Sequence, residues 1–147
     1  MRKQGDLEPG QEITLPTEPQ WEKAARGTDG WIYSWGDEPD PQRANYVETG
    51  IGTTSAVGCF PGGVSAYGVE DLSGNVWEWC RTKWEGNYED YQNDNDVQGP
   101  DHRVLRGGSF GDNERCVRCA SRNLVNPDFR YGYFGFRVVV SPCSRTK

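Results

Sequence analysis

Glycine and proline restrict the fold of this chain more than any other feature. The 147 residues include 19 Gly and 9 Pro, which interrupt regular helices and strands and favour turns. Only 34% of the residues are hydrophobic and the mean hydropathy is −0.85, so a large aliphatic core is not available. A chain of this length can still bury one lean core. The sequence therefore predicts a single loop-rich domain built from short elements.

Aromatic residues compensate for the shortage of aliphatic ones. The chain has six Trp, seven Tyr and five Phe. Each ring removes a large apolar area from water when it is buried. We therefore expect a few aromatic side chains to supply much of the core.

The charge balance limits the classes of partner. The net charge is −6 and the pI is about 4.8, which disfavours nucleic acid because phosphate binding needs a basic surface. No segment is apolar enough for membrane insertion, and the N-terminus does not resemble a secretion signal. A cytoplasmic location is the default expectation, while surface or phage display stays open. A local basic patch at Arg115, Arg118, Arg122 and Arg130 stays open beside the alternative that these side chains pair with carboxylates.

The cysteines do not predict a disulfide framework. Their number is odd and their spacing is scattered, which favours reduced thiols. The five are Cys59, Cys80, Cys116, Cys119 and Cys143.

One helix is predicted over residues 18–26. Thr17 can cap its first turn, Pro19 lies where a first-turn proline is tolerated, and Gly27 can end it. The apolar residues, Trp21 among them, recur at helical spacing on one face.

Most of the other predicted elements are short extended segments. Alternating or apolar runs bounded by Gly, Pro and Asp indicate strands, and the acidic, polar stretch 85–102 indicates a long loop. The extended segments are 31–35, 52–63, 76–80, 104–110 and 134–141.

A series of short sequence words carries a family resemblance. The words LPTE..WE.AARG, WGDEPD, YG..DLSGNVWEW, RVLRGGS, R.A.RN and GFRVV follow one another from about Leu15 to Val140. In this order they resemble the sulfatase-modifying-factor family, also called the formylglycine-generating-enzyme family. The resemblance implies an α+β, C-type-lectin-like fold with short twisted antiparallel strands, one or two helices and extensive loops.

The resemblance also divides the chain. Residues 1–14 form a polar N-terminal segment, residues 15–142 the C-type-lectin-like domain, and residues 143–147 a tail. Domains of this family usually carry a further portion before the LPTE helix. Either the domain is shortened here, or residues 1–14 rebuild its first strands.

Catalysis of the family's type is not predicted. The name-giving enzyme uses a cysteine pair and copper to oxidise a cysteine of a peptide, and thiolates suit Cu(I). Here the interval 110–117 is short and holds one cysteine, Cys116, three residues before Cys119. An oxidase acting through Cys116 and Cys119 is therefore the alternative reading. A single histidine, His102, argues against an iron site of the kind found in another branch of the family.

The segment 106–137 alternates between family words and an unrelated mixture of residues. Fifteen positions form the mixture, and none of them is Lys, Glu, Gln, Met or Trp. Those five residues are the ones that cannot arise when the first two bases of an AAC or AAT codon are randomised. We call these fifteen the variable positions: Gly111, Asp112, Asn113, Arg115, Cys116, Ser121, Asn123, Leu124, Val125, Asn126, Phe129, Tyr131, Gly132, Tyr133 and Phe134.

This pattern is similar to the variable region of a protein diversified by a retroelement, which copies a template into the target gene while mutating adenines. Ordinary loop drift is the competing explanation. Ten of the other positions would then be anchors, buried or hydrogen-bonded, while the variable positions face solvent. The anchors are Arg118, Cys119, Ala120, Arg122, Pro127, Asp128, Arg130, Gly135, Phe136 and Arg137.

The function predicted from this pattern is non-catalytic ligand binding. Exposed aromatic, amide and hydroxyl side chains suit a broad contact surface, so the expected ligand is a protein or another macromolecule. An undiversified partner-docking or sensor module is a further alternative.

The resemblance also implies a structural Ca²⁺ site. Its ligands would be the Asp71 and Glu78 side chains and the main-chain carbonyls of Gly74 and Val76, which are the hard oxygen donors that Ca²⁺ prefers. The alternative is that Glu78 pairs with an arginine and Asp71 caps a turn. A second calcium site of the family would begin at Asn45, but its later aspartate has no clear match here.

Overall fold

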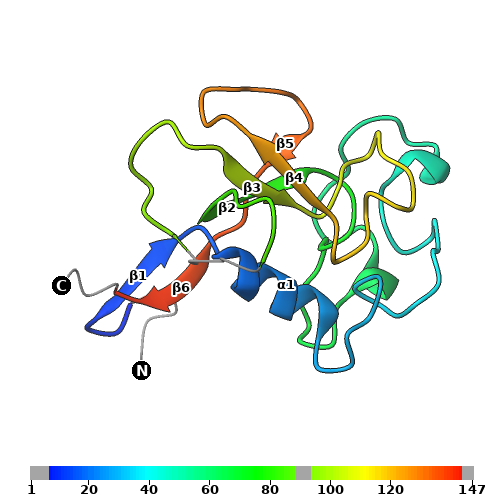
Figure 1. The fold of residues 1–147 in the computed structure, drawn as a ribbon. Helices are drawn as coiled ribbons and strands as arrows, with labels where there is room; N and C mark the ends of the chain where they lie inside the picture. Colours follow the sequence, from blue (N-terminus) through cyan, green and yellow to red (C-terminus); the bar gives the residue numbers. More distant parts are fainter. Residues whose placement is uncertain (1–6, 89–93, 144–147) are drawn as a thin grey trace.

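The computed structural model describes residues 7–88 and 94–143. One helix, two 3₁₀ turns and six short strands are joined by long loops (Figure 1). In chain order they are β1 (Gln11–Thr14), α1 (Glu18–Arg26), η1 (Val47–Thr49), η2 (Pro61–Gly63), β2 (Trp77–Lys83), β3 (Arg103–Arg106), β4 (Arg122–Val125), β5 (Phe134–Gly135) and β6 (Val139–Pro142). None of the helices in the described residues could span a bilayer.

Helix α1 has the predicted bounds. The Thr17 hydroxyl accepts a hydrogen bond from the Gln20 amide, and the Gln20 side chain accepts one from the Thr17 amide, which completes a capping box. Pro19 lies in the first turn, and the Gly27 amide closes the last turn by donating to the Lys23 carbonyl. The helix prediction is confirmed because all of its start and stop signals are local.

The strands form two small sheets. A four-stranded sheet has the order β4-β3-β2-β5, and β1 pairs with β6 in a separate two-stranded ribbon. The pairings are antiparallel except that β5 runs parallel to β2, which departs from the expected all-antiparallel arrangement. The ladder between β2 and β3 is also irregular between Trp79 and Lys83.

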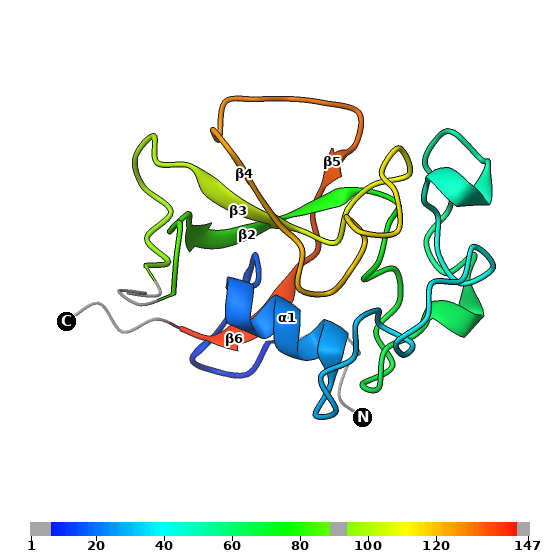
Figure 2. The same cartoon turned by 45° about the vertical axis from the view of Figure 1, so that its right-hand side comes forward.

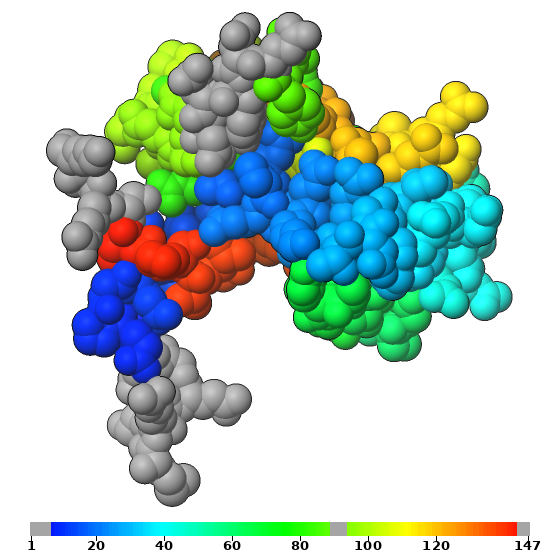
Figure 3. Space-filling view, turned by 60° about the horizontal axis from the view of Figure 1, so that its bottom comes forward, coloured from blue at the N-terminus to red at the C-terminus, as the bar shows by residue number. Residues whose placement is uncertain are grey.

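The sheet lies between α1 and the loop that joins β4 to β5. In both ribbon views α1 lies below the four-stranded sheet and the β4–β5 loop rises above it (Figures 1 and 2). The space-filling view from below shows the surface of α1 between the β1–β6 ribbon and the loops that follow the helix (Figure 3). The helix therefore covers one face of the sheet and leaves the other side to the loop.

Several strand predictions need correction. Segment 31–35 forms only an isolated bridge from Tyr33 to Gly36, and segment 52–63 consists of turns and η2. Segment 134–141 is divided between β5 and β6. Short apolar runs rich in aromatic residues satisfy the strand pattern without finding a partner strand, because pairing is decided by distant parts of the chain.

One strand was left open by the sequence and another was not predicted. β1 lies in residues 1–14, for which a rebuilt first strand was one of the two expectations, and its register with β6 pairs Ile13 with Val140. β4 lies inside the variable segment and pairs with β3. Both strands are only four residues long and at least half polar, so neither carries a strong strand pattern.

The core is split into two clusters with aromatic members, as expected. Trp21 and Ala25 of α1 pack with Leu72, Cys80, Val104 and Cys119. A second cluster under the loops contains Tyr33, Ala44, Tyr46 and Val117, with Trp35 packed against it.

A buried network of charges joins α1 to β3 and β4. The Glu18 carboxylate is almost fully buried and accepts hydrogen bonds from Arg106 Nη1 (3.2 Å) and from Arg122 Nη2 (2.9 Å). The Arg106 side chain has no exposed surface and also donates to Glu22 and to the Cys119 carbonyl. The Arg122 guanidinium lies over the Trp84 ring at 4.3 Å. One carboxylate thus connects elements from both ends of the sequence.

Glu18→Ala is expected to destabilise the domain strongly. Loss of the carboxylate leaves Arg106 buried without its full charge compensation, which typically costs about 3–5 kcal/mol of unfolding free energy. The matched control is Glu12→Gln, because Glu12 is a partly exposed partner of Arg81 and should cost less than about 1 kcal/mol. Urea denaturation followed by tryptophan fluorescence measures both. Equal effects of the two substitutions would contradict the assigned role of Glu18.

Candidate ligand-binding site

The structure leaves all fifteen variable positions accessible. None of them is buried. Gly111, Asn113, Arg115, Leu124, Phe129, Tyr131, Gly132 and Tyr133 are exposed, and Asp112, Cys116, Ser121, Asn123, Val125, Asn126 and Phe134 are partly buried. They lie in two parts of the chain, the loop before β4 and the stretch from β4 to β5.

Four rings of the second part form what we call the aromatic cluster: Phe129, Tyr131, Tyr133 and Phe134. The Tyr131 ring is stacked on Tyr133 at 5.3 Å and on Phe129 at 6.2 Å between centroids. Phe134 meets Tyr131 and Tyr133 edge-on and reaches Trp79 of β2. The first three rings keep 39–52% of their surface exposed. The rings therefore support one another above the sheet and do not join the core.

The aromatic cluster borders a hollow of about 390 Å³ beside β4. Eight variable positions line this hollow, together with His102. The Asn123 and Asn126 side-chain oxygens accept hydrogen bonds from the amides of Leu124 and Asp128. Within the described residues their Nδ2 groups have no protein acceptor, so they remain able to donate to a ligand. The hollow combines aromatic walls with amide donors, as binding surfaces do.

The loop before β4 presents a second set of variable positions. Asn113 and Arg115 are exposed, and the Ser121 hydroxyl donates to the Arg115 carbonyl at 2.7 Å, which closes the loop. Trp77 of β2 connects the two sets, because its amide donates to the Tyr133 carbonyl and its Nε1 donates to the Asp112 carboxylate. The sets therefore flank a common residue of the sheet.

Asp112 differs from the other variable positions. Its carboxylate accepts hydrogen bonds from Trp77 Nε1 (2.8 Å), from the Ser109 amide (2.9 Å) and from the Ser109 hydroxyl (2.5 Å). The carbonyl of Asp112 accepts from the Val47 amide at 2.9 Å. The side chain thus holds the RGGS turn against β2, so Asp112 has a structural role beside any contact with ligand.

The anchors are less uniform than expected. Cys119 is buried, and Arg122 and Arg137 are bound by carboxylates. In contrast, Phe136 keeps 69% of its surface exposed and Arg130 is also exposed. Arg118, Ala120 and Asp128 are exposed as well. Sequence reasoning had no signal for this, because the family words do not distinguish buried from exposed positions.

The two cysteines of the oxidase alternative are poorly suited to form thiolates. Burial raises the pKa of the Cys119 thiol to about 12. Burial and the neighbouring Asp112 and Glu114 carboxylates raise the pKa of Cys116 as well. Copper binding and redox chemistry both need the thiolate, so these surroundings work against them.

The predicted calcium ligands have other partners. The Glu78 carboxylate accepts hydrogen bonds from Arg137 Nε (2.5 Å), from Arg137 Nη2 (2.7 Å) and from Trp21 Nε1 (2.6 Å). Arg137 Nη2 also donates to the Asp71 carbonyl, and the Asp71 carboxylate accepts from the Gly58 amide. A guanidinium therefore already neutralises Glu78, and this arrangement does not fit Ca²⁺ unless Arg137 is displaced.

Gly74 in the same turn packs too closely for any side chain. A Cβ at Gly74 would lie 2.3 Å from the Asn45 carbonyl oxygen, and its φ of 83° lies in the left-handed region. Among the predicted carbonyl ligands, that of Gly74 accepts from the Val76 amide at 2.9 Å. The turn is therefore held by its own hydrogen bonds and by contact with Asn45.

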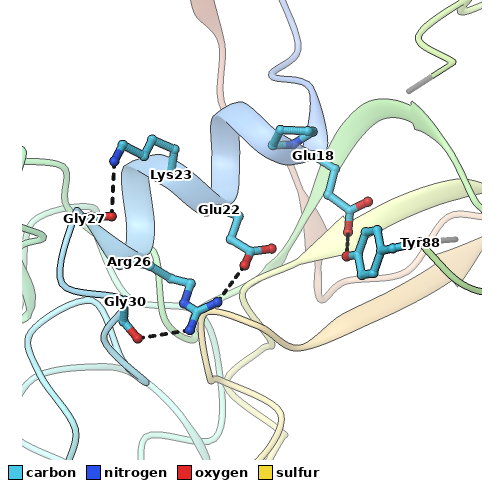
Figure 4. A pocket seen from close by; sticks show the side chains of 8 residues that line it. Glu18, Glu22, Lys23, Arg26, Gly27, Gly30 and Tyr88 are labelled. Atoms are coloured by element: carbon cyan, nitrogen blue, oxygen red, sulfur yellow. Dashed lines mark hydrogen bonds and ion pairs between the residues drawn. The ribbon is translucent and has the colours of Figure 1, made fainter. Parts of the chain in front are cut away.

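A separate hollow of about 570 Å³ lies beside α1 and contains no predicted site residue (Figure 4). Its charged side chains interact with one another and with the backbone. Arg26 donates to Glu22 and to the Gly30 carbonyl, and the Tyr88 hydroxyl lies 3.4 Å from Glu18. These contacts belong to the network that holds α1 on the sheet.

The architecture is that of a formylglycine-generating-enzyme-like, C-type-lectin-like domain, with one helix on a curled sheet and most of the chain in loops. The chain belongs to the sulfatase-modifying factor enzyme 1-like domain family, which it matches over residues 4–142.

Both active and inactive members are among its relatives. It is 36% identical to the formylglycine-generating enzyme of Thermomonospora curvata over 87% of this chain and 49% of that protein. It is 35% identical to the inactive C-alpha-formylglycine-generating enzyme 2 of Mus musculus over 86% of this chain and 42% of that protein. The chain spans half or less of the length of these relatives, so similarity alone does not assign activity.

A solved structure shares the fold closely. It is Treponema denticola variable protein 1, with a TM-score of 0.74, 29% identity, and coverage of 86% of this chain and 46% of that protein.

Asp112→Ala is expected to destabilise the domain although the position is accessible. The Trp77 and Ser109 donors would lose their acceptor, which costs about 2–3 kcal/mol of unfolding free energy. The matched control is Asn113→Ala, one residue further on and exposed, with an expected cost below about 1 kcal/mol. Chemical denaturation of both variants measures the difference. An unchanged stability in Asp112→Ala would contradict the structural role.

The calcium prediction can be tested by thermal unfolding. If the Arg137–Glu78 pair holds the turn, millimolar Ca²⁺ or EDTA leaves the melting temperature unchanged, whereas Arg137→Gln lowers the unfolding free energy by roughly 3 kcal/mol because it leaves Glu78 buried without its partner. A rise in melting temperature with Ca²⁺ that is abolished by Glu78→Gln would instead establish a calcium site.

Proposed function

We propose that this chain is a non-catalytic ligand-binding domain whose binding surface is formed by the aromatic cluster and β4. The observation that carries the proposal is that the four rings between Phe129 and Phe134 pack on one another, stay partly exposed and border the hollow beside β4. A monomer rarely exposes such a group of rings unless it binds something. The ligand would be a protein or another macromolecule, because the surface is spread over several elements.

We further propose that a retroelement diversifies this surface. A diversified receptor needs a scaffold whose stability does not depend on the changing side chains. The absence of buried residues among the variable positions supports this need, and Asp112, whose carboxylate holds the RGGS turn, is the exception to it. The structural similarity to a relative named a variable protein supports the same interpretation.

The scaffold requirement predicts tolerance at the aromatic cluster. The double substitution Tyr131→Ser and Tyr133→Ser, reachable by the same codon changes, should lower the unfolding free energy by no more than about 1 kcal/mol, since both rings are largely exposed. The matched control is Tyr33→Ser, which removes a buried ring and should cost more than about 3 kcal/mol. Denaturation curves of both variants measure the two losses of unfolding free energy. If the double variant is destabilised as much as Tyr33→Ser, the cluster is part of the core and the proposal fails.

The gene itself tests diversification. The expected finding is a second, near-identical copy of the DNA for residues 106–137 beside a reverse-transcriptase gene, with asparagine codons at the variable positions. If the gene has no such copy beside it, diversification by a retroelement is contradicted, while the proposal of ligand binding is unaffected.

A further inference from the structure

A second hollow, with a volume of about 500 Å³, shares Phe129, Tyr131 and Phe134 with the hollow beside β4. One wall is formed by Phe129, Tyr131 and Phe134, which are variable positions. The rest comes from positions outside the variable set on β2, β3, β5 and the neighbouring loops, among them Trp79, Arg81, Arg103, Arg130 and Phe136. The hollow is thus lined partly by variable positions and partly by positions outside the variable set, which we call its constant wall.

The constant wall carries three arginines and no carboxylate. The most buried is Arg103, whose side chain donates to the carbonyls of Arg81 (3.1 Å), Asp96 (2.6 Å) and Gln98 (3.1 Å). Only 5% of Arg103 is exposed, and it forms no ion pair within the described residues. Backbone dipoles therefore solvate its charge, and the Asp94 carboxylate, which is paired with Lys83, is attracted by this charge without forming an ion pair with Arg103.

The other two arginines add to the same charge. Arg130 donates to the carbonyls of Pro127 and Phe129, is exposed, and has no acidic partner in residues 7–88 and 94–143. Among the described residues Arg81 forms an ion pair only with Glu12, at 3.5 Å, and Glu12 lies outside the hollow. The lining of the hollow therefore contains three cationic side chains and no carboxylate, although the whole chain carries a net charge of −6.

Such a hollow selects the charge of its ligand. Apolar walls exclude water, and unneutralised cations act more strongly where water is excluded. An anionic group bound at the exposed Arg130 is also attracted by the charges of Arg81 and Arg103 in the same hollow, whereas a cationic group is repelled by all three.

The apolar part of the hollow suits a large side chain. Phe129 and Tyr131 on one wall are about half exposed, and Phe136 on the other is 69% exposed. Aromatic pockets of this kind hold the side chains that dominate protein–protein binding. The neighbouring arginines can bind a carboxylate by charge-assisted hydrogen bonds.

We propose that this hollow binds a segment of a protein partner in which a carboxylate stands beside an aromatic or large aliphatic side chain. The apolar side chain would lie against Phe129, Tyr131 and Phe134, and the carboxylate would be bound by Arg130. This inference rests on the proposed function and specifies its ligand. Because the arginines lie outside the variable positions, the preference for an acidic partner persists when the aromatic wall changes.

Selection from a random peptide display library on the folded chain tests the proposal. The expected result is enrichment of peptides with Asp or Glu next to Trp, Phe, Leu or Ile. A fluorescein-labelled enriched peptide is then titrated by anisotropy. Arg130→Gln should weaken its binding about tenfold, Arg130→Lys should retain most of it, and a rise in salt should weaken it. The matched control is Arg118→Gln, an exposed arginine outside the hollow, which should have no effect.

The variants separate failure of this inference from failure of the proposed function. Neutral or basic peptides whose binding is lost in Tyr131→Ser but kept in Arg130→Gln would overturn the acidic preference and leave the binding surface in place. If peptide binding is unaffected by either substitution, or if no peptide is enriched at all, both the acidic preference and the proposed binding surface fail for a protein ligand. Concentration-dependent dimerisation abolished by Arg130→Gln would assign the hollow to a second copy of the chain and overturn the inference.

Discussion

The buried carboxylate of Glu18 is the interaction on which the rest of the structure depends. Glu18 begins the only helix in the described residues, and its partners Arg106 and Arg122 lie on β3 and β4. A buried charge without a partner is costly, so these elements are stable only when they are assembled together. β4 is an edge strand of the four-stranded sheet, and the loop with the aromatic cluster follows it directly. The position of the proposed binding surface therefore depends on a charge pair on the opposite side of the sheet.

Polar contacts repeat this role where the chain has no regular structure. Asp112 fastens the RGGS turn to Trp77, and Arg137 fastens the segment between β5 and β6 to Glu78. Each contact gives a long loop a definite position without strand pairing, as a lean core requires. Because polar contacts position the loops, the aromatic rings between β4 and β5 can stay outside the core. They are supported by one another and by Trp79.

The family can contain catalytic and non-catalytic members on one scaffold because the chemistry depends on a few side chains. Here the surroundings of Cys116 and Cys119 oppose thiolate formation, while the outer side of the sheet offers exposed rings, free amide donors and a hollow lined by three arginines. A constant cationic wall beside a changeable aromatic wall would allow new contacts while keeping one class of partner.

The sequence by itself determined the family, the loop-rich fold and the bounds of α1, because these are set by ordered words, by Gly and Pro content and by local capping. It also indicated that the variable positions avoid the core, but it did not separate them from the anchors, of which only Cys119 is buried. Only the tertiary structure decided that the Asp112 carboxylate accepts a hydrogen bond from Trp77 and that Arg137 pairs with Glu78, because these pairs are 35 and 59 residues apart in the chain. The arginines of the hollow were missed for the same reason. Their common environment arises only when β2, β3 and the β4–β5 loop come together, and no local pattern records it.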